Sequence, residues 1–76
     1  MRYKCIKEMC LPKYDGEGFE IPNEYGFVTA GSIWERDDRG SIISADVHLD
    51  SLNDDSNLGW IEISFEDLKE NFVLIE

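Results

Sequence analysis

Apolar and polar residues alternate most regularly in the C-terminal half of the chain, where the pattern predicts β-strands. From Ile43 to Asp50 every second residue is apolar, as in a strand with one buried face. The inward set is Ile43, Ala45, Val47 and Leu49, and the outward set is Ser44, Asp46, His48 and Asp50. A second alternation begins at Trp60 and predicts another strand. Its inward residues are Ile61 and Ile63, and its outward residues are Trp60 and Glu62.

The last thirteen residues predict a short helix followed by a final strand. Ser64 is followed three residues later by Asp67, a spacing that favours a helix start with Ser64 as the N-cap. The helix can extend only from Phe65 to Glu70, because Asn71 breaks it. The segment Phe72–Ile75 is apolar on both faces. We therefore expect it to be a strand packed inside the domain.

The N-terminal half is less regular. Residues Tyr3–Cys10 predict a first strand, which Pro12 ends because proline has no amide donor. A long connection follows over Leu11–Tyr25, with a turn signal at its Asp-Gly pair that could make the tip of an irregular hairpin, and with enough apolar residues to pack against the domain. Gly31 predicts a tight turn with positive φ, and Ser32–Arg36 predicts the next strand.

This order of elements resembles that of an SH3-like barrel. The long connection lies where that fold has its first loop, Ala30–Trp34 resembles its small-Gly-Asp-apolar-apolar segment, and Asn71–Val73 resembles its closing Asn-Tyr-Val. The resemblance implies a mostly β fold, a small SH3-like barrel of about five strands with one short helix before the C-terminal strand. The chain lacks the Ala-Leu-Tyr-Asp-Tyr start and the proline before the helix, so we do not expect it to bind proline-rich peptides.

The chain also resembles small acidic uncharacterised barrel proteins of phages and mobile elements of Gram-positive bacteria, which implies a similar origin. Its 76 residues correspond to a single domain, residues 1–76. Its net charge of −10 is uneven. Residues 1–39 carry six Lys/Arg and eight Asp/Glu, whereas residues 40–76 carry one and nine. This charge disfavours direct binding to nucleic acid and favours a partner with a basic surface.

Cysteine use and hydropathy indicate a cytoplasmic protein. Cys5 and Cys10 are five residues apart in the predicted first strand, so they point to opposite faces and are expected to stay reduced. Two cysteines without a second Cys/His pair do not predict a zinc site. The sequence has no secretory h-region and no apolar run long enough to span a membrane, so we expect no membrane contact.

Candidate catalytic and metal-binding groups are few, and we expect neither an enzyme nor a cofactor. The loop that begins at Asn53 does not match a calcium loop, because its glycine is the seventh residue and Ser64 is the twelfth. His48 lies between Asp46 and Asp50 on the outward face, which leaves a small hydrolase as an alternative. No nucleophile or oxyanion motif accompanies His48 in the sequence.

Two tryptophans are predicted to face away from the core. Because Ile33 and Ile61 are assigned inward, their neighbours Trp34 and Trp60 are assigned outward. They could form an exposed aromatic platform for a partner. They could instead form the floor of a second apolar cluster, covered by Tyr14, Phe19 and Ile21 of the long connection, and a chain this short favours burying its rings.

The acidic C-terminal half carries the predicted function, a non-enzymatic accessory protein that binds another protein through its acidic surface. The predicted partner-binding residues are Asp46, Asp50, Asp54, Asp55, Trp60, Glu66 and Glu70. An alternative is a nucleic-acid mimic, in which fixed carboxylates imitate phosphates and inhibit a host DNA- or RNA-binding protein.

Overall fold

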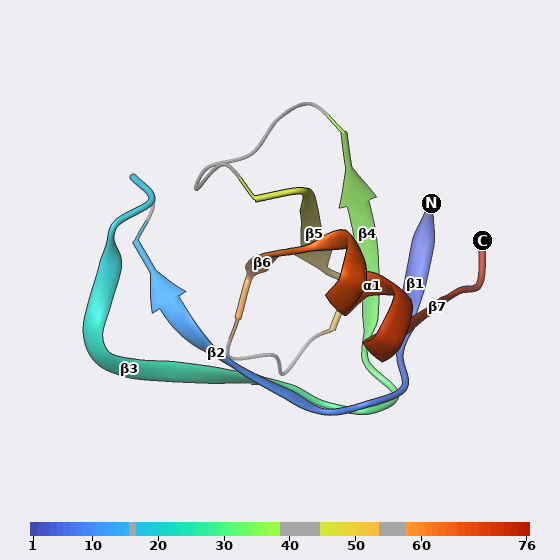
Figure 1. Ribbon diagram of the computed structural model, residues 1–76, viewed down its shortest axis with the longest axis horizontal. Helices are drawn as coiled ribbons and strands as arrows, with labels where there is room; N and C mark the ends of the chain where they lie inside the picture. Colours follow the sequence, from blue (N-terminus) through green and yellow to red (C-terminus); the bar gives the residue numbers. More distant parts are fainter. Residues whose placement is uncertain (16, 39–44, 54–57) are drawn as a thin grey trace.

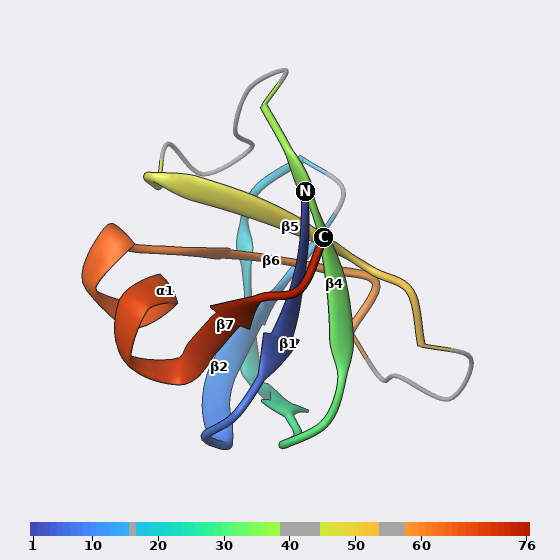
Figure 2. The same ribbon diagram turned by 90° about the vertical axis from the view of Figure 1, so that its right-hand side faces the viewer.

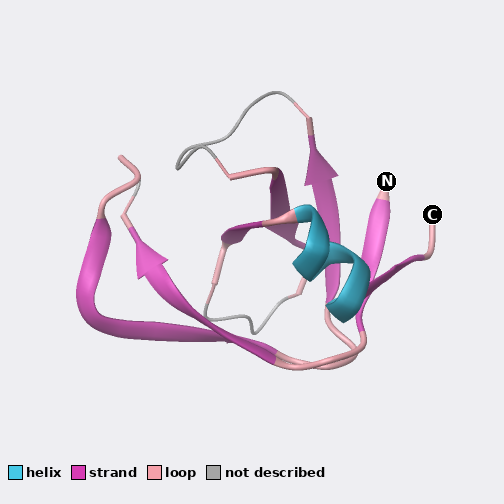
Figure 3. Ribbon diagram, viewed as in Figure 1, coloured by secondary structure: helices cyan, strands magenta, loops and turns pink. Residues whose placement is uncertain are grey.

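The computed structural model describes residues 1–15, 17–38, 45–53 and 58–76, and these residues form a mostly β fold with one short helix before the final strand (Figures 1 and 3). The strands are β1 (Arg2–Cys5), β2 (Met9–Tyr14), β3 (Glu20–Val28), β4 (Ile33–Asp37), β5 (Val47–Ser51), β6 (Trp60–Ile63) and β7 (Phe72–Leu74), and the helix is α1 (Phe65–Asn71). The mostly β class and the place of the helix are therefore confirmed.

The strands form two sheets. Five of them make an antiparallel sheet in the order β6-β5-β4-β1-β7, and β2 and β3 pair separately as a two-stranded sheet. Among the described residues β6 and β7 are the edges of the larger sheet, so hydrogen bonds do not close it. In Figure 1 the β2–β3 hairpin extends to the left, away from β1 and β7.

The predicted strand Tyr3–Cys10 is wrong, because the chain leaves one sheet and enters the other within it. Two backbone hydrogen bonds fix the chain where it leaves the larger sheet. Ile6 N–H donates to the carbonyl of Asn71, and Gly31 N–H donates to the carbonyl of Cys5, both at 2.7 Å. Met9 then starts β2. One stretch of alternating apolar and polar residues therefore supplies strands to two sheets.

The predicted connection Leu11–Tyr25 is also wrong as a loop, because most of it is the β2–β3 hairpin. Asp15 forms its turn by accepting hydrogen bonds from the N–H groups of Glu17 and Phe19 at 2.9 and 3.0 Å. Pro12 does not end the strand but lies inside β2, next to a register shift between Pro12 and Tyr14. A two-stranded ribbon tolerates the missing proline donor where its ladder is irregular.

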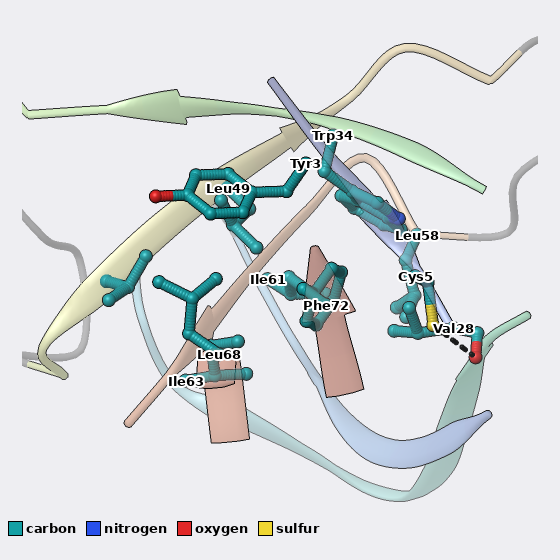
Figure 4. Packing of buried hydrophobic residues seen from close by; sticks show 11 residues of the cluster. Tyr3, Cys5, Val28, Trp34, Leu49, Leu58, Ile61, Ile63, Leu68 and Phe72 are labelled. Carbon is teal, nitrogen blue, oxygen red and sulfur yellow. Dashed lines mark hydrogen bonds between the residues drawn. The ribbon is translucent and has the colours of Figure 1, made fainter. Parts of the chain in front are cut away.

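The hydrophobic core packs against the larger sheet and includes residues of β3 and α1 (Figure 4). The buried apolar residues are Tyr3, Cys5, Val28, Trp34, Val47, Leu49, Leu58, Ile61, Ile63, Leu68 and Phe72. Val47 and Leu49 were predicted to face inward, and this is confirmed. The predicted start of that strand, including Ile43 and Ser44, lies outside the described residues.

The outward assignment of Trp34 is wrong. Its side chain is 1% exposed and belongs to the core, and its indole N–H donates to Ser32 Oγ at 2.8 Å. Trp34 pairs with Tyr3 of β1, another core residue, so the larger ring rather than Ile33 takes the inward position. The hydrogen bond to Ser32 satisfies the one polar atom that burial of the indole would otherwise leave without a partner.

The turn before β4 is confirmed. Gly31 has φ of +93°, and Ser32 N–H donates to the carbonyl of Thr29 at 3.1 Å. This geometry is that of a type II turn, which requires positive φ at its third residue. A side chain at Gly31 would meet no neighbouring atom but would strain the backbone.

The N-cap of α1 is confirmed, because Ser64 Oγ accepts a hydrogen bond from Asp67 N–H at 3.1 Å. The helix extends one residue beyond the prediction, since Asn71 is its last residue. With seven residues, α1 is too short to span a membrane, and no described helix is long and apolar enough to do so.

The predicted burial of the segment Phe72–Ile75 is wrong. Only Phe72 is buried, whereas Val73 and Leu74 are 41% and 57% exposed. The reason is that β7 is an edge strand paired with β1 alone, so half of its surroundings are solvent. The chain ends run side by side, as Figure 2 shows, and Arg2 N–H donates to the carbonyl of Glu76 at 2.9 Å.

Candidate functional site

Two rows of side chains lie on the outer face of β4, β5 and β6, opposite the core. The strand register aligns Asp37, His48 and Glu62 in one row. It aligns Glu35, Asp50 and Trp60 in the next row. Residues directly opposite one another in an antiparallel sheet point to the same side, so the rows are neighbours on one face.

His48 is the centre of this face. Its Nδ1 lies 2.8 Å from Glu62 Oε2, and its Nε2 lies 3.0 Å from Asp50 Oδ1. The ring also stacks on Trp60, with centroids 5.4 Å apart and planes 13° apart. Although His48 faces away from the core, it is only 9% exposed, and the Glu62 side chain is fully buried.

These contacts favour a charged imidazole. A neutral ring has one N–H, so it can donate to only one of the two carboxylates, whereas the imidazolium donates to both. Burial alone lowers the pKa of His48, but the hydrogen bonds to Glu62 and Asp50 outweigh burial and leave that pKa raised. The cluster thus favours the charged form of His48, which the sequence placed on the outward face between two aspartates.

The same cluster contains metal-ligand atoms. One donor atom each from Asp37, His48 and Asp50 lie within 4.8 Å of one another. Asp37 and His48 also line a hollow of about 190 Å³. The sequence analysis expected no metal ligand, because the three residues come from two strands whose pairing was unknown.

A second pocket, of about 210 Å³, lies between the β2–β3 hairpin and β6. Its lining residues are Leu11, Pro12, Lys13, Tyr14, Ile21, Leu58, Gly59, Trp60, Ile61 and Glu62. The rings of Tyr14 and Trp60 lie 6.3 Å apart at a 34° tilt. Leu58 packs closely against the hairpin at Gly26, where an added Cβ would overlap the leucine side chain. We call this cavity the seam pocket, since it follows the line where the hairpin meets the larger sheet.

The predicted partner-binding residues lie in different surroundings. Asp50 and Trp60 are cross-strand neighbours beside the seam pocket. Asp46 instead accepts a hydrogen bond from the N–H of Phe65 at 3.3 Å, at the start of α1. Glu66 and Glu70 are exposed on that helix, and Asp54 and Asp55 lie outside the described residues. No single face is shown to gather the whole set.

The two interpretations of the tryptophans have a mixed outcome. A platform of two outward tryptophans is wrong, because Trp34 is in the core. Trp60 is partly buried, and the hairpin residues Tyr14 and Ile21 line the pocket beside it, as expected for a covered floor. Phe19 was expected to join that cover but is 67% exposed at the hairpin end.

Sequence analysis missed Glu62 and Asp37 as parts of the site. A signal for Glu62 was present, because the alternation around Ile61 placed it on the outward face with Trp60. The missing information was the register, which brings Glu62 opposite His48. Comparisons with protein-family models, curated proteins and solved structures found no match to this chain. Its function therefore has to be inferred from its own residues.

Proposed function

We propose that this chain is a non-enzymatic protein-binding module, and that the seam pocket holds an apolar side chain from a basic segment of its partner. The observation that carries the proposal is the pocket itself, an apolar hollow of about 210 Å³ with a tryptophan in its wall and carboxylates beside it. Pockets of this kind bind one anchoring side chain, and polar groups at the edge orient the rest of the ligand.

The apolar part of the pocket comes from both sides of the seam. Leu11 and Ile21 contribute from the hairpin, and Trp60 contributes from β6. Tyr14 lies beside Trp60, so two aromatic rings border the opening. Aromatic side chains dominate binding energies at protein interfaces because they bury a large area with few rotatable bonds.

Charge selects the partner. Asp50 is the cross-strand neighbour of Trp60, and Glu62 lines the pocket. His48 is hydrogen-bonded to both carboxylates and Lys13 lines the pocket, so the attraction for a basic segment comes mainly from the chain's net charge of −10. A segment with lysine or arginine beside its apolar anchor is attracted to this surface, whereas an acidic segment is repelled.

We also propose that the domain is an SH3-like barrel. The terminal strands β1 and β7 pair, β4 joins them to the β5–β6 hairpin, and β2–β3 extends from the first connection. The turn at Gly31 lies between that hairpin and β4. The Gly31 turn, the strands that follow it, the helix and the last strand support the element order that suggested the resemblance, whereas the long connection is a hairpin. A crystal structure of the chain tests whether the two sheets close around the core.

The nucleic-acid mimic and the hydrolase stay predictions. Exposed carboxylates such as Glu66 and Glu70 suit a mimic. For a hydrolase, His48 has a carboxylate partner in Asp50. Ser51 is the described serine nearest to His48 along the chain. It lies on the same face of β5 as Leu49, opposite the face of His48, and its hydroxyl accepts hydrogen bonds from Asn53.

The test is a screen of short peptides that combine one large apolar residue with lysine or arginine. We expect binding to shift the amide resonances of Leu11, Lys13, Tyr14, Ile21 and Gly59–Ile61. Trp60→Ala should weaken binding at least tenfold, while Leu52→Ala, which alters an exposed leucine away from the pocket, should not change it. The melting temperature of each variant shows whether it is folded.

Two outcomes would contradict the proposal. One is that Trp60→Ala and wild type bind the selected peptide equally. The other is that the shifted resonances lie on α1 rather than along the seam. A steep fall of affinity to nothing with added salt would favour the mimic, because an anchor buried in an apolar pocket keeps part of its binding energy when surface charges are screened.

A further inference from the structure

We propose that Asp37, His48 and Asp50 form a binding site for a divalent transition-metal ion, with Zn²⁺ as the ion that fits best. The proposal goes beyond peptide binding at the seam pocket, and none of these three residues lines that pocket. It rests on the arrangement of donor atoms, on the orientation of the imidazole, and on the space and charge beside it.

The donor atoms are already close together. His48 Nε2 and Asp50 Oδ1 lie 3.0 Å apart, and all three donors fall within 4.8 Å. Around a tetrahedral zinc ion with bonds of about 2.0–2.2 Å, neighbouring ligand atoms are about 3.3 Å apart. Asp50 is 44% exposed at its side chain, so it can rotate to complete the approach.

Glu62 gives the imidazole the orientation that a metal ligand needs. Its carboxylate lies 2.8 Å from Nδ1 and is fully buried, so it fixes a proton on that nitrogen. Nε2 then faces Asp50. Metal-binding histidines usually donate their second N–H to a carboxylate or carbonyl in this way, which holds the ring and raises its basicity. A cation at Nε2 would take the place of the proton shared with Asp50.

The surroundings supply room and negative charge. The hollow of about 190 Å³ beside Asp37 and His48 has space for water to complete the coordination shell. Asp38 and Asp46 also line it. The one cation described in its wall, Arg36, has its guanidinium 2.9 Å from a carboxylate oxygen of Asp38. The carboxylates therefore outnumber the cation around the site.

The donor set narrows the choice of ion. One imidazole nitrogen favours Zn²⁺ or another transition metal over Ca²⁺ and Mg²⁺, which prefer oxygen ligands alone. No thiolate is available to select Cu⁺ at this site, because Cys5 is buried in the core and Cys10 lies in the hairpin. Two carboxylates and one imidazole, with open positions for water, are a donor set that zinc accepts.

The test titrates the protein with Zn²⁺ alone by calorimetry at one fixed pH. We expect saturable binding with one ion per chain. His48 is the single histidine of the sequence, so its Nε2 resonance can be identified without ambiguity and should shift on binding. Asp50→Asn and Asp37→Asn should each weaken binding at least tenfold, and Glu62→Gln should weaken it by about 10- to 100-fold.

Matched controls separate a site from general attraction to an acidic protein. Glu66→Gln and Glu70→Gln remove the same charge from exposed positions on α1 and should change the affinity less than twofold. The half-exposed Asp50→Asn keeps the shape of the side chain, and a thermal melt confirms folding. The proposal is overturned if Zn²⁺ shows no saturable binding, if Glu66→Gln weakens it as much as Asp50→Asn, or if Nε2 does not shift.

Discussion

The two faces of the β5–β6 pair each bury a pair of side chains at their centre, but the two pairs are chemically opposite. On the inner face Leu49 and Ile61 are 0% and 3% exposed, and both are aliphatic. On the outer face His48 and Glu62 are each 9% exposed, and both are ionisable. The same two strands therefore bury an apolar pair against the core and a charged pair on the other side. Alternation along a strand shows which residues share a face, but it does not show how deeply that face is covered.

The two faces stabilise the strand pair in different ways. Inner-face burial is non-directional and grows with the apolar area removed from water. Outer-face contacts are directional, because the bond between His48 and Glu62 requires these two residues to lie opposite each other. The inner face thus supplies most of the stability, and the outer face fixes the register.

The largest effect is expected on the inner face. Leu49→Ala should lower the free energy of unfolding by about 2–5 kcal/mol, because it removes buried methyl groups and leaves a cavity at a fully enclosed position. Chemical denaturation measures this loss. Leu52→Ala is the matched control three residues along the chain, 46% exposed, and should change stability by less than about 0.5 kcal/mol. Equal losses would mean that Leu49 is not in the core.

A smaller effect is expected on the outer face. Glu62→Gln keeps the shape of the side chain but replaces a charge-assisted hydrogen bond to His48 with a neutral one, so the loss should be about 1–3 kcal/mol. Asp50→Asn, at the half-exposed partner, should cost less than about 1 kcal/mol.

A double-mutant cycle shows whether the outer-face loss belongs to the pair. Combining Glu62→Gln with His48→Gln should give a coupling energy of at least about 0.5 kcal/mol. A coupling near zero would show that each residue contributes separately, and the outer face would then have no role in fixing the register.

Sequence analysis predicted the features that depend on local chemistry. The N-cap at Ser64 and the positive φ at Gly31 need only neighbouring residues, and both are confirmed. The inward assignment of Val47 and Leu49 was correct because successive residues of a strand point to opposite faces. The Asp-Gly pair suggested the tip of an irregular hairpin, but the length of its strands was missed because Pro12 was taken as the end of a strand, whereas an irregular position in β2 accommodates it.

The candidate site could not be predicted from any single segment of the sequence. Asp37, His48 and Glu62 come from three strands, and only their register makes them one row. The predicted burial of Phe72–Ile75 was wrong for a related reason. The apolar sequence Phe72–Leu74 gives no sign that β7 is at a sheet edge, with a neighbour on one side only. Pairing order and register are tertiary properties, which local patterns do not determine.

The smallest predicted effect comes from the way in which each face shifts the pKa of an ionisable group. The outer face raises the pKa of His48 by hydrogen bonds to carboxylates, which stabilise its charged form. The inner face raises the pKa of Cys5 above its ordinary value of 9.0 for a different reason, because burial disfavours the thiolate. The thiol is fully buried, and its sulfur lies 3.2 Å from the carbonyl oxygen of Lys7.

Cys5 therefore predicts a loss of stability at alkaline pH. Because its pKa is higher in the folded state, its contribution is fully present below pH 9.0 and decreases as pH rises from there through the folded pKa, by at most about 1.4 kcal/mol per pH unit. Denaturation at a series of alkaline pH values measures the slope. Cys5→Ala should flatten it relative to wild type, whereas Cys10→Ala should not, because Cys10 is exposed. An unchanged slope in Cys5→Ala would mean that the inner face does not disfavour the charged thiolate. The two faces would then differ in the side chains they contact, but not in whether they favour the charged form of an ionisable group.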